Sequence, residues 1–158
     1  MTLLRTTSEN SDYQKLVTLL DATLKILDGE EHEFYAQYNK SDSIKNVIVS
    51  YDKNQPVGCG AFKFYEEGKV EIKRMFVMPN ARGQGIAKKI LVELEQWAAE
   101  LGFSTCVLET GVKQVEAIGL YQQAGYVIIP NYGQYQGVAN SLCMQKSIKL
   151  SKNLTIKK

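Results

Sequence analysis

Residues 77–88 read Val77-Met78-Pro79-Asn80-Ala81-Arg82-Gly83-Gln84-Gly85-Ile86-Ala87-Lys88. An apolar strand pattern ends here, two glycines follow, and a helical pattern begins at once. Glycine adopts backbone conformations that are closed to other residues, and it leaves room for a bulky anion beside the main chain. The first amides of a helix lack internal partners and lie at the positive end of its dipole. The stretch therefore predicts a strand–turn–helix whose amides bind a phosphate or pyrophosphate.

A glycine turn between a strand and a helix also occurs in many α/β proteins without binding any ligand. Two named phosphate-binding motifs are excluded. The Walker loop needs G-x-x-x-x-G-K-[ST], which is absent. The dinucleotide fingerprint needs a third glycine at the position where Lys88 stands. The glycines alone leave both the structural and the anion-binding interpretation open.

The flanking sequence predicts a mixed α/β domain. Apolar residues at spacings of three and four indicate amphipathic helices over 11–27 and 86–101. Ser11 and Asp12 are expected to cap the first helix, and Gly102 to stop the second. Shorter helices are expected at 31–38 and 115–124. Strands are expected at 2–6, 46–51, 56–65, 70–77, 104–109, 126–129 and 142–148. The resulting order, β-α-α-β-β-β-α-β-α-β-β, predicts one domain over residues 1–150 and a polar C-terminal tail over 151–158.

Composition narrows the class of protein. The 158 residues are 44% hydrophobic and 23% charged. The formal net charge of +2 is too small for a protein whose main function is to bind nucleic acid. No apolar run reaches the roughly 18 residues of a membrane span, and the N-terminus has no signal-peptide pattern. We therefore expect a cytoplasmic protein with no nucleic-acid or membrane partner. Three dispersed cysteines and a single histidine predict reduced, buried thiols and no metal site.

Two motifs resemble one known family. The run Arg82-Gly83-Gln84-Gly85-Ile86-Ala87 matches Q/R-x-x-G-x-G/A, and residues 117–126 match A-x-x-L-Y-x-x-x-G-[FY]. Both are signatures of the GCN5-related N-acetyltransferase (GNAT) superfamily, and the strand over 71–77 is of the family type. The resemblance covers residues 2–150. It implies a central, twisted, mixed but mostly antiparallel sheet of six to seven strands, flanked by about four helices.

The resemblance also implies acetyl-coenzyme A as the acetyl-donor substrate, without a metal. In the family, loop amides bind the pyrophosphate, and the preceding strand pairs with the pantetheine arm through its backbone. Carried over, the strand residues are Met75, Phe76 and Val77. The loop residues are Arg82, Gly83, Gln84, Gly85, Ile86 and Ala87, with Lys88 beside them. Many members have Asn where this chain has Gln114, whose longer arm leaves the pantetheine contact open.

Two residues match catalytic positions of the family. Tyr121 corresponds to the general acid that protonates the departing thiolate; the alternative is a core aromatic on an amphipathic helix. Glu71 lies where the histone-acetylating branch carries its general base. A base is needed because an ammonium group cannot attack a thioester. The alternative for Glu71 is a surface salt bridge with Lys69 or Lys73.

In this family the acceptor pocket is formed by segments that correspond to residues 28–38 and 130–140 here. The candidate contacts are Glu33, Tyr35, Tyr132 and Tyr135. Aromatic rings with carboxylates suit a small cationic amine, whereas amides and hydroxyls suit an amino acid. Acidic residues at a helix start and polar hairpin loops are also ordinary structural features.

The expected function is therefore an acetyl-coenzyme A-dependent N-acetyltransferase. It moves acetyl to a primary amine of a small molecule, such as an amino acid or polyamine, by direct attack in a ternary complex. One alternative is an acyl-coenzyme A-binding sensor or interaction module without turnover. Another is a protein or peptide acetyltransferase acting on lysine or N-terminal amines. A homodimer is also expected, because the apolar strand over 142–148 would hide a sheet edge by pairing.

Overall fold

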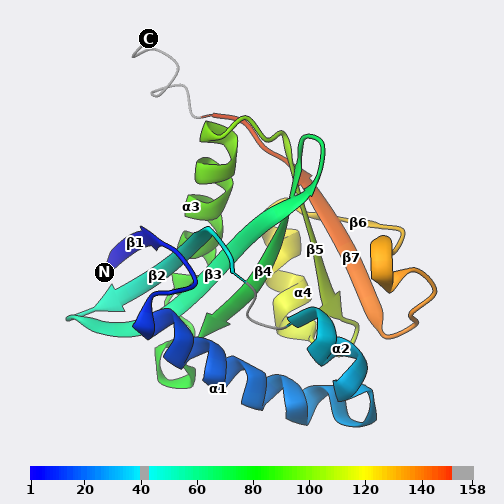
Figure 1. Cartoon of the computed structure of the whole chain (residues 1–158), viewed down its shortest axis with the longest axis horizontal. Helices are drawn as coiled ribbons and strands as arrows, with labels where there is room; N and C mark the ends of the chain where they lie inside the picture. The colour runs from blue at the N-terminus through cyan, green and yellow to red at the C-terminus, as the bar shows by residue number, and fades with distance from the viewer. Residues whose placement is uncertain (40–42, 151–158) are drawn as a thin grey trace. The chain divides into compact units, whose positions relative to one another are not determined.

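The structure is a computed structural model that describes residues 1–39 and 43–150, apart from the side chains of 37–39. Its element order confirms the expected order of strands and helices and runs from β1 to β7 in Figure 1. The expected tail at 151–158 lies outside the described residues. The elements are β1 Thr2–Thr6, α1 Ser11–Asp28, α2 His32–Asn39, β2 Asn46–Asp52, β3 Gln55–Glu66, β4 Lys69–Val77, α3 Ile86–Glu100, β5 Thr105–Gly111, α4 Val115–Gln123, β6 Val127–Ile129 and β7 Ser141–Ser147.

The strands form a seven-stranded sheet in the order β1-β2-β3-β4-β5-β7-β6. The pairs β1–β2, β2–β3, β5–β7 and β6–β7 are antiparallel. The pair β4–β5 is parallel, with Glu71 opposite Val107. The expected mixed, mostly antiparallel sheet is confirmed.

The expectation that the last strand is a sheet edge is wrong. β7 lies between two strands, because Gln145 pairs with Val107 of β5 on one side and with Val127 of β6 on the other. The short β6 therefore forms this end of the sheet order. The order of the strands along the chain could not show this, because β7 follows β6 in the sequence but lies between β5 and β6 in the sheet.

The chain divides into two compact units. The first contains residues 1–63 and 73–94, and α1 supplies much of its core. Four residues of α1 recur at helical spacing and are buried: Tyr13, Leu16, Val17 and Leu20. They share a hydrophobic cluster with Ile44, Val47, Val49, Cys59, Ala61 and Phe76. The cap of α1 is Asn10, whose side chain accepts a hydrogen bond from the Tyr13 amide at 2.9 Å, so the expected capping by Ser11 and Asp12 is wrong.

The second unit contains residues 64–72 and the chain from Glu95 on. Its centre is β5, with Cys106, Val107 and Leu108 fully or almost fully buried. Glu95 is also buried, and it accepts hydrogen bonds from the Tyr126 hydroxyl and the Lys146 ammonium, both at 2.8 Å. A buried carboxylate is tolerated when it is paired in this way. Tyr126, the last residue of the second motif, is therefore held by a structural network.

The three cysteines are free and buried, as predicted. Burial raises the pKa of Cys59 and of Cys106 to about 12. Burial also raises the pKa of Cys143, to about 11. All three thiols are therefore protonated at neutral pH, which makes them poor nucleophiles.

Arg74 in β4 has an unusual backbone. Its φ is 60°, in the left-handed region that non-glycine residues rarely adopt. Its side chain is 1% exposed and donates to the Asp21 carboxylate at 2.7 Å. The Nε and Nη1 atoms are buried without a hydrogen-bond partner. The ion pair and the surrounding packing thus hold a strained residue inside the first unit.

Replacing Arg74 by Gly or by Ala tests this strain. Both variants lose the guanidinium and should be less stable than the wild type. Arg74→Gly should nevertheless unfold at a higher urea concentration than Arg74→Ala, because a Cβ in the left-handed region costs about 1–2 kcal/mol. The measurement is the urea midpoint of each variant. A more stable alanine variant would show that position 74 does not hold the left-handed conformation.

Candidate active site

The glycine loop connects β4 to α3 within the first unit. After Val77 the chain makes a 3-10 turn over Pro79–Ala81 and enters α3 at Ile86. Gly83 and Gly85 have φ values of 81° and 76°, which favour glycine strongly. A Cβ built at either glycine meets nothing within 4 Å. Glycine is thus required at these two positions by the backbone conformation, whereas a side chain would not clash with neighbouring residues.

The loop presents its backbone to solvent at the start of α3. Arg82, Gly83, Gln84 and Gly85 are exposed, whereas Ile86 is buried and anchors the first turn. The helical ladder begins where the Lys89 amide donates to the Gly85 carbonyl at 3.1 Å. The preceding amides of a helix have no partner within it. They form a site that matches an anionic oxygen cluster such as a pyrophosphate.

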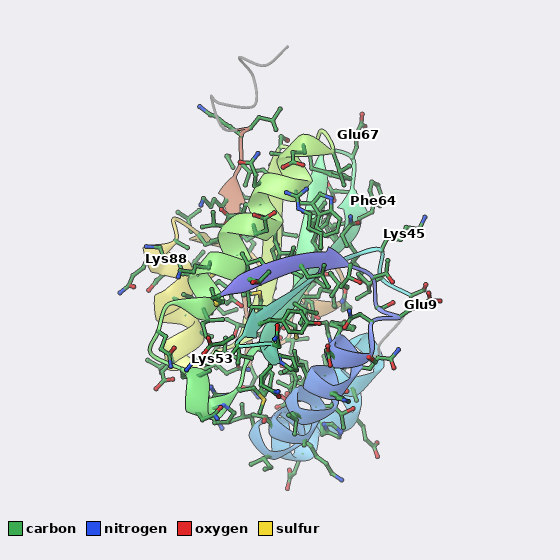
Figure 2. All side chains as sticks on the ribbon, turned by 90° about the vertical axis from the view of Figure 1, so that its left-hand side faces the viewer. Glu9, Lys45, Lys53, Phe64, Glu67 and Lys88 are labelled. Atoms are coloured by element: carbon green, nitrogen blue, oxygen red, sulfur yellow. The ribbon has the colours of Figure 1, made fainter. Side chains whose placement is uncertain are left out.

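Two basic side chains flank the loop and differ in role. The Arg82 Nε donates to the Val77 carbonyl at 3.0 Å, and its guanidinium carbon lies 5.9 Å from the centre of the Phe76 ring. Arg82 therefore ties the loop back to the end of β4. Lys88 is exposed and extends from the surface (Figure 2), so its charge is available to a bound anion.

The strand before the loop carries the residues that are expected to contact the pantetheine arm of acetyl-coenzyme A. Phe76 is 7% exposed, whereas Met75 and Val77 are partly buried. The Val77 carbonyl already accepts a hydrogen bond from Arg82. A carbonyl has two lone pairs, so this bond leaves it able to accept another.

Glu71 lies in the second unit and is buried, with 4% of its surface exposed. The Tyr132 hydroxyl donates to its Oε2 atom at 2.6 Å. The predicted alternative placed Glu71 at the surface, and its burial contradicts that position. Lys69 lies 3.8 Å from Glu66. A buried carboxylate on the sheet suits a base that works away from bulk water.

Tyr121 lies on α4 and is 7% exposed. Its ring meets the edge of the Tyr126 ring at 5.8 Å between centroids. Burial, and after it the Glu109 carboxylate, raises the pKa of Tyr121 above its ordinary value. The phenol therefore keeps its proton at neutral pH, as an acid catalyst must. The same packing also fits the structural interpretation of Tyr121.

Gln114 stands immediately before α4. The backbone amide of Gln114 donates to the Gly111 carbonyl at 3.0 Å, and this hydrogen bond closes the turn that follows β5. Its side-chain Nε2 lies 3.2 Å from the position of a Cβ at Gly111. The Gln114 side chain thus folds over the end of β5, where the lack of a side chain at Gly111 leaves it room.

The expected acceptor residues fall into two groups. Tyr132 and Tyr135 lie in the second unit, with ring centroids 5.8 Å apart, and Tyr132 reaches Glu71. Glu33 and Tyr35 lie on α2 in the first unit. Glu33 is exposed, whereas Tyr35 is buried, with its ring centroid 5.1 Å from that of Phe34. Within the second unit, the structure brings Tyr132 and Tyr135 together with the expected base.

Sequence reasoning missed several residues of these sites. The Tyr65 ring packs on Tyr132 at 4.9 Å, and Glu109 acts on the pKa of Tyr121. In the first unit a cavity of about 360 Å³ lies between α1 and α2. It is lined by Asp21, Ala22, Leu24, Lys25, Asp28, His32 and Ala36. Sheet register and helix packing create these contacts, and no local motif marks them.

Among residues 1–39 and 43–150, no three His, Cys, Asp or Glu side chains are grouped so as to hold a metal ion. No helix in this part of the chain combines the length and apolar character needed to cross a bilayer.

Comparison with known sequences gives a consistent result. The Acetyltransferase (GNAT) family pattern matches residues 13–126. An IAA acetyltransferase of Azospirillum brasilense is 42% identical over 102 residues, which are 64% of this chain and 67% of that protein. The uncharacterized N-acetyltransferase YjgM of Escherichia coli (strain K12) is 41% identical over 108 residues, 67% of this chain and 64% of that protein. The match thus spans about two thirds of these relatives.

Solved structures agree. A protein from Klebsiella pneumoniae described as an acyl-CoA N-acyltransferase has a TM-score of 0.78 and 30% identity, and the match covers 93% of this chain and 97% of that one. The PaiA N-acetyltransferase of Thermoplasma acidophilum, crystallised with coenzyme A, has a TM-score of 0.67 and 16% identity over 93% and 99% of the two chains, which shows a shared fold. The resemblance inferred from the two motifs is confirmed, and the chain belongs to the Acetyltransferase (GNAT) family.

Proposed function

We propose that this protein transfers the acetyl group of acetyl-coenzyme A to a primary amine of a small molecule. The observation that carries the proposal is the exposed turn between β4 and α3, where two left-handed glycines precede the free amides of a helix. We take residues 1–150 as the transferase domain. A cytoplasmic location remains a prediction from the sequence. The predicted homodimer loses the basis given for it, because β7 lies between β5 and β6 and is not a sheet edge.

The loop binds the donor in this proposal. Backbone amides from Arg82 to Ala87 hold the pyrophosphate, and Lys88 adds a positive charge beside it. The backbone of Met75, Phe76 and Val77 pairs with the pantetheine arm in the manner of an added strand. Gln114 offers a side-chain amide to the same arm. Acetyl-coenzyme A supplies an activated thioester.

Glu71 and Tyr121 carry the two proton transfers. Glu71 takes a proton from the acceptor ammonium, so that the nitrogen lone pair attacks the thioester carbonyl. The carbon–sulfur bond breaks as the carbon–nitrogen bond forms, and the sulfur leaves with the bonding electrons. Tyr121 gives its proton to the leaving thiolate. The acylated nitrogen then releases its second proton, which reprotonates Tyr121 through solvent, and Glu71 passes the proton that it took to solvent. No covalent acyl-enzyme is needed, in keeping with three buried, protonated cysteines.

The acceptor class is the less constrained part of the proposal. Buried carboxylate and tyrosine groups at Glu71 and Tyr132 fit an amine that arrives as a cation. The name of the Azospirillum relative, an IAA acetyltransferase, supports a small-molecule acceptor. Glu33 and Tyr35 stay candidates for acceptor contacts from α2.

Gly85→Asp should weaken the binding of acetyl-coenzyme A by at least tenfold, which corresponds to about 1.4 kcal/mol. The new carboxylate repels the pyrophosphate, and the left-handed backbone is strained by a Cβ. Isothermal titration calorimetry measures the dissociation constant. Gly102→Asp is the matched control, because Gly102 also has a left-handed φ, of 94°, and open space around it. Equal affinities for the two variants would contradict the role of the loop.

Tyr121→Phe should lower kcat by about 100-fold or more, because the departing thiolate loses its proton donor. The variant keeps the ring and its edge contact with Tyr126. Steady-state kinetics with saturating acetyl-coenzyme A give kcat, and calorimetry should show an unchanged dissociation constant for the donor. A wild-type kcat would leave Tyr121 with a packing role alone.

Glu71→Gln should lower kcat/KM by about 100-fold or more and remove the acid limb of its pH profile. Glutamine has the shape of glutamate and still accepts a hydrogen bond from Tyr132, but it cannot take a proton from the amine. The measurement is kcat/KM for the acceptor as a function of pH. An unchanged profile would assign the deprotonation to another group.

A further inference from the structure

The bond between Tyr132 and Glu71 is short. The distance from the hydroxyl oxygen to Oε2 is 2.6 Å. Distances of about 2.5–2.7 Å are typical of an O–H donor on a carboxylate and indicate a strong, charge-assisted hydrogen bond. Tyr132 supplies this bond without cancelling the negative charge of the carboxylate.

Tyr132 lies in the segment between β6 and β7, which Figure 1 shows at the end of the sheet. The Asn131 side-chain amide donates to the carbonyls of Val138 and Ser141, both at 3.0 Å, which closes the segment at its base. The Tyr135 amide donates to the Tyr132 carbonyl at 2.9 Å. The backbone around Tyr132 is therefore fixed by the segment's own hydrogen bonds.

Two further rings fix the Tyr132 side chain. The Tyr65 ring of β3 packs against it at 4.9 Å, and the Tyr135 ring at 5.8 Å with an interplanar angle of 89°. Both contacts are edge-on, as aromatic pairs prefer. The hydroxyl therefore reaches Glu71 from a ring that has little freedom to turn away.

The surroundings keep Tyr132 protonated. Burial, and after it the Glu71 carboxylate, raises the pKa of Tyr132 well above its ordinary value. Tyr132 thus donates to Glu71 throughout the pH range in which the enzyme would work. The titratable groups that interact with this pair are Tyr65 of β3, Glu109 of β5, Tyr135 of the β6–β7 segment and Cys143 of β7.

We propose that Tyr132 is a positioning residue for Glu71: its donated hydrogen bond fixes the carboxylate plane and stabilises the ionised form that accepts the amine proton. The inference rests on the proposed function, in which Glu71 is the base. Tyr132 itself gives up no proton in the reaction and acts through Glu71.

Tyr132→Phe tests the proposal because it removes the hydroxyl and keeps the ring. The kcat/KM for the acceptor should fall by about tenfold or more, with a pH profile that differs from that of the wild type, since a hydrogen bond to a charged group is lost. Tyr65→Phe is the matched control. It removes a hydroxyl from the adjoining ring and keeps the hydrogen bond from Tyr132 to Glu71. Its profile should match that of the wild type.

The double variant separates positioning from other roles. In the Glu71→Gln background, adding Tyr132→Phe should change kcat/KM by less than about twofold, because residues that act as a unit are not additive. A wild-type profile for Tyr132→Phe, or an equal loss in both backgrounds, would overturn the inference and leave the role of Glu71 intact. A wild-type profile for Glu71→Gln would overturn the base assignment and the inference together.

Discussion

The turn between β4 and α3 is the constraint on which the rest of the account depends. A helix must leave its first amides without internal partners, and a strand that runs directly into a helix needs residues that accept a left-handed backbone. Gly83 and Gly85 meet that need at φ values of 81° and 76°. Open space surrounds both positions, and the proposed function uses this backbone shape to receive the pyrophosphate of the donor.

Three of the buried charged residues have partners of different kinds. Glu95 accepts from an ammonium and a phenol, which is a structural solution. Arg74 is paired with Asp21 through one nitrogen while two others stay without partners, so strain and incomplete pairing coincide in β4. Glu71 accepts a short bond from a phenol that leaves its negative charge intact. Burying a charge is costly, and the kind of partner indicates what the charge is for.

Local signals in the sequence predicted much of the fold. Helical spacing predicted α1 and α3, glycines marked the turns, and alternating or continuous apolar runs marked the strands. The motif around residues 82–87 predicted the loop between β4 and α3, and both of its glycines have the conformation that such a loop requires. Each of these features depends on residues within a few positions of one another.

Features that depend on distant residues were not predictable in the same way. The insertion of β7 between β5 and β6 follows from strand pairing, so the apolar pattern of 142–148 wrongly indicated an edge. The burial of Glu71 depends on the strands around it, and its bond partner Tyr132 is 61 positions away. Even the cap of α1 was misplaced by one residue, because Asn10 and Ser11 are both good capping residues.

Release of free thiol from acetyl-coenzyme A tests whether this chain is a small-molecule acetyltransferase. The release is measured over a panel of polyamines, amino acids, aminoglycosides and lysine peptides. Calorimetry on the same preparation measures binding of the donor. The account predicts donor binding together with turnover on one class of small amine. Turnover on the lysine peptides alone would contradict the acceptor class, and absence of donor binding would contradict the role of the loop on which the account depends.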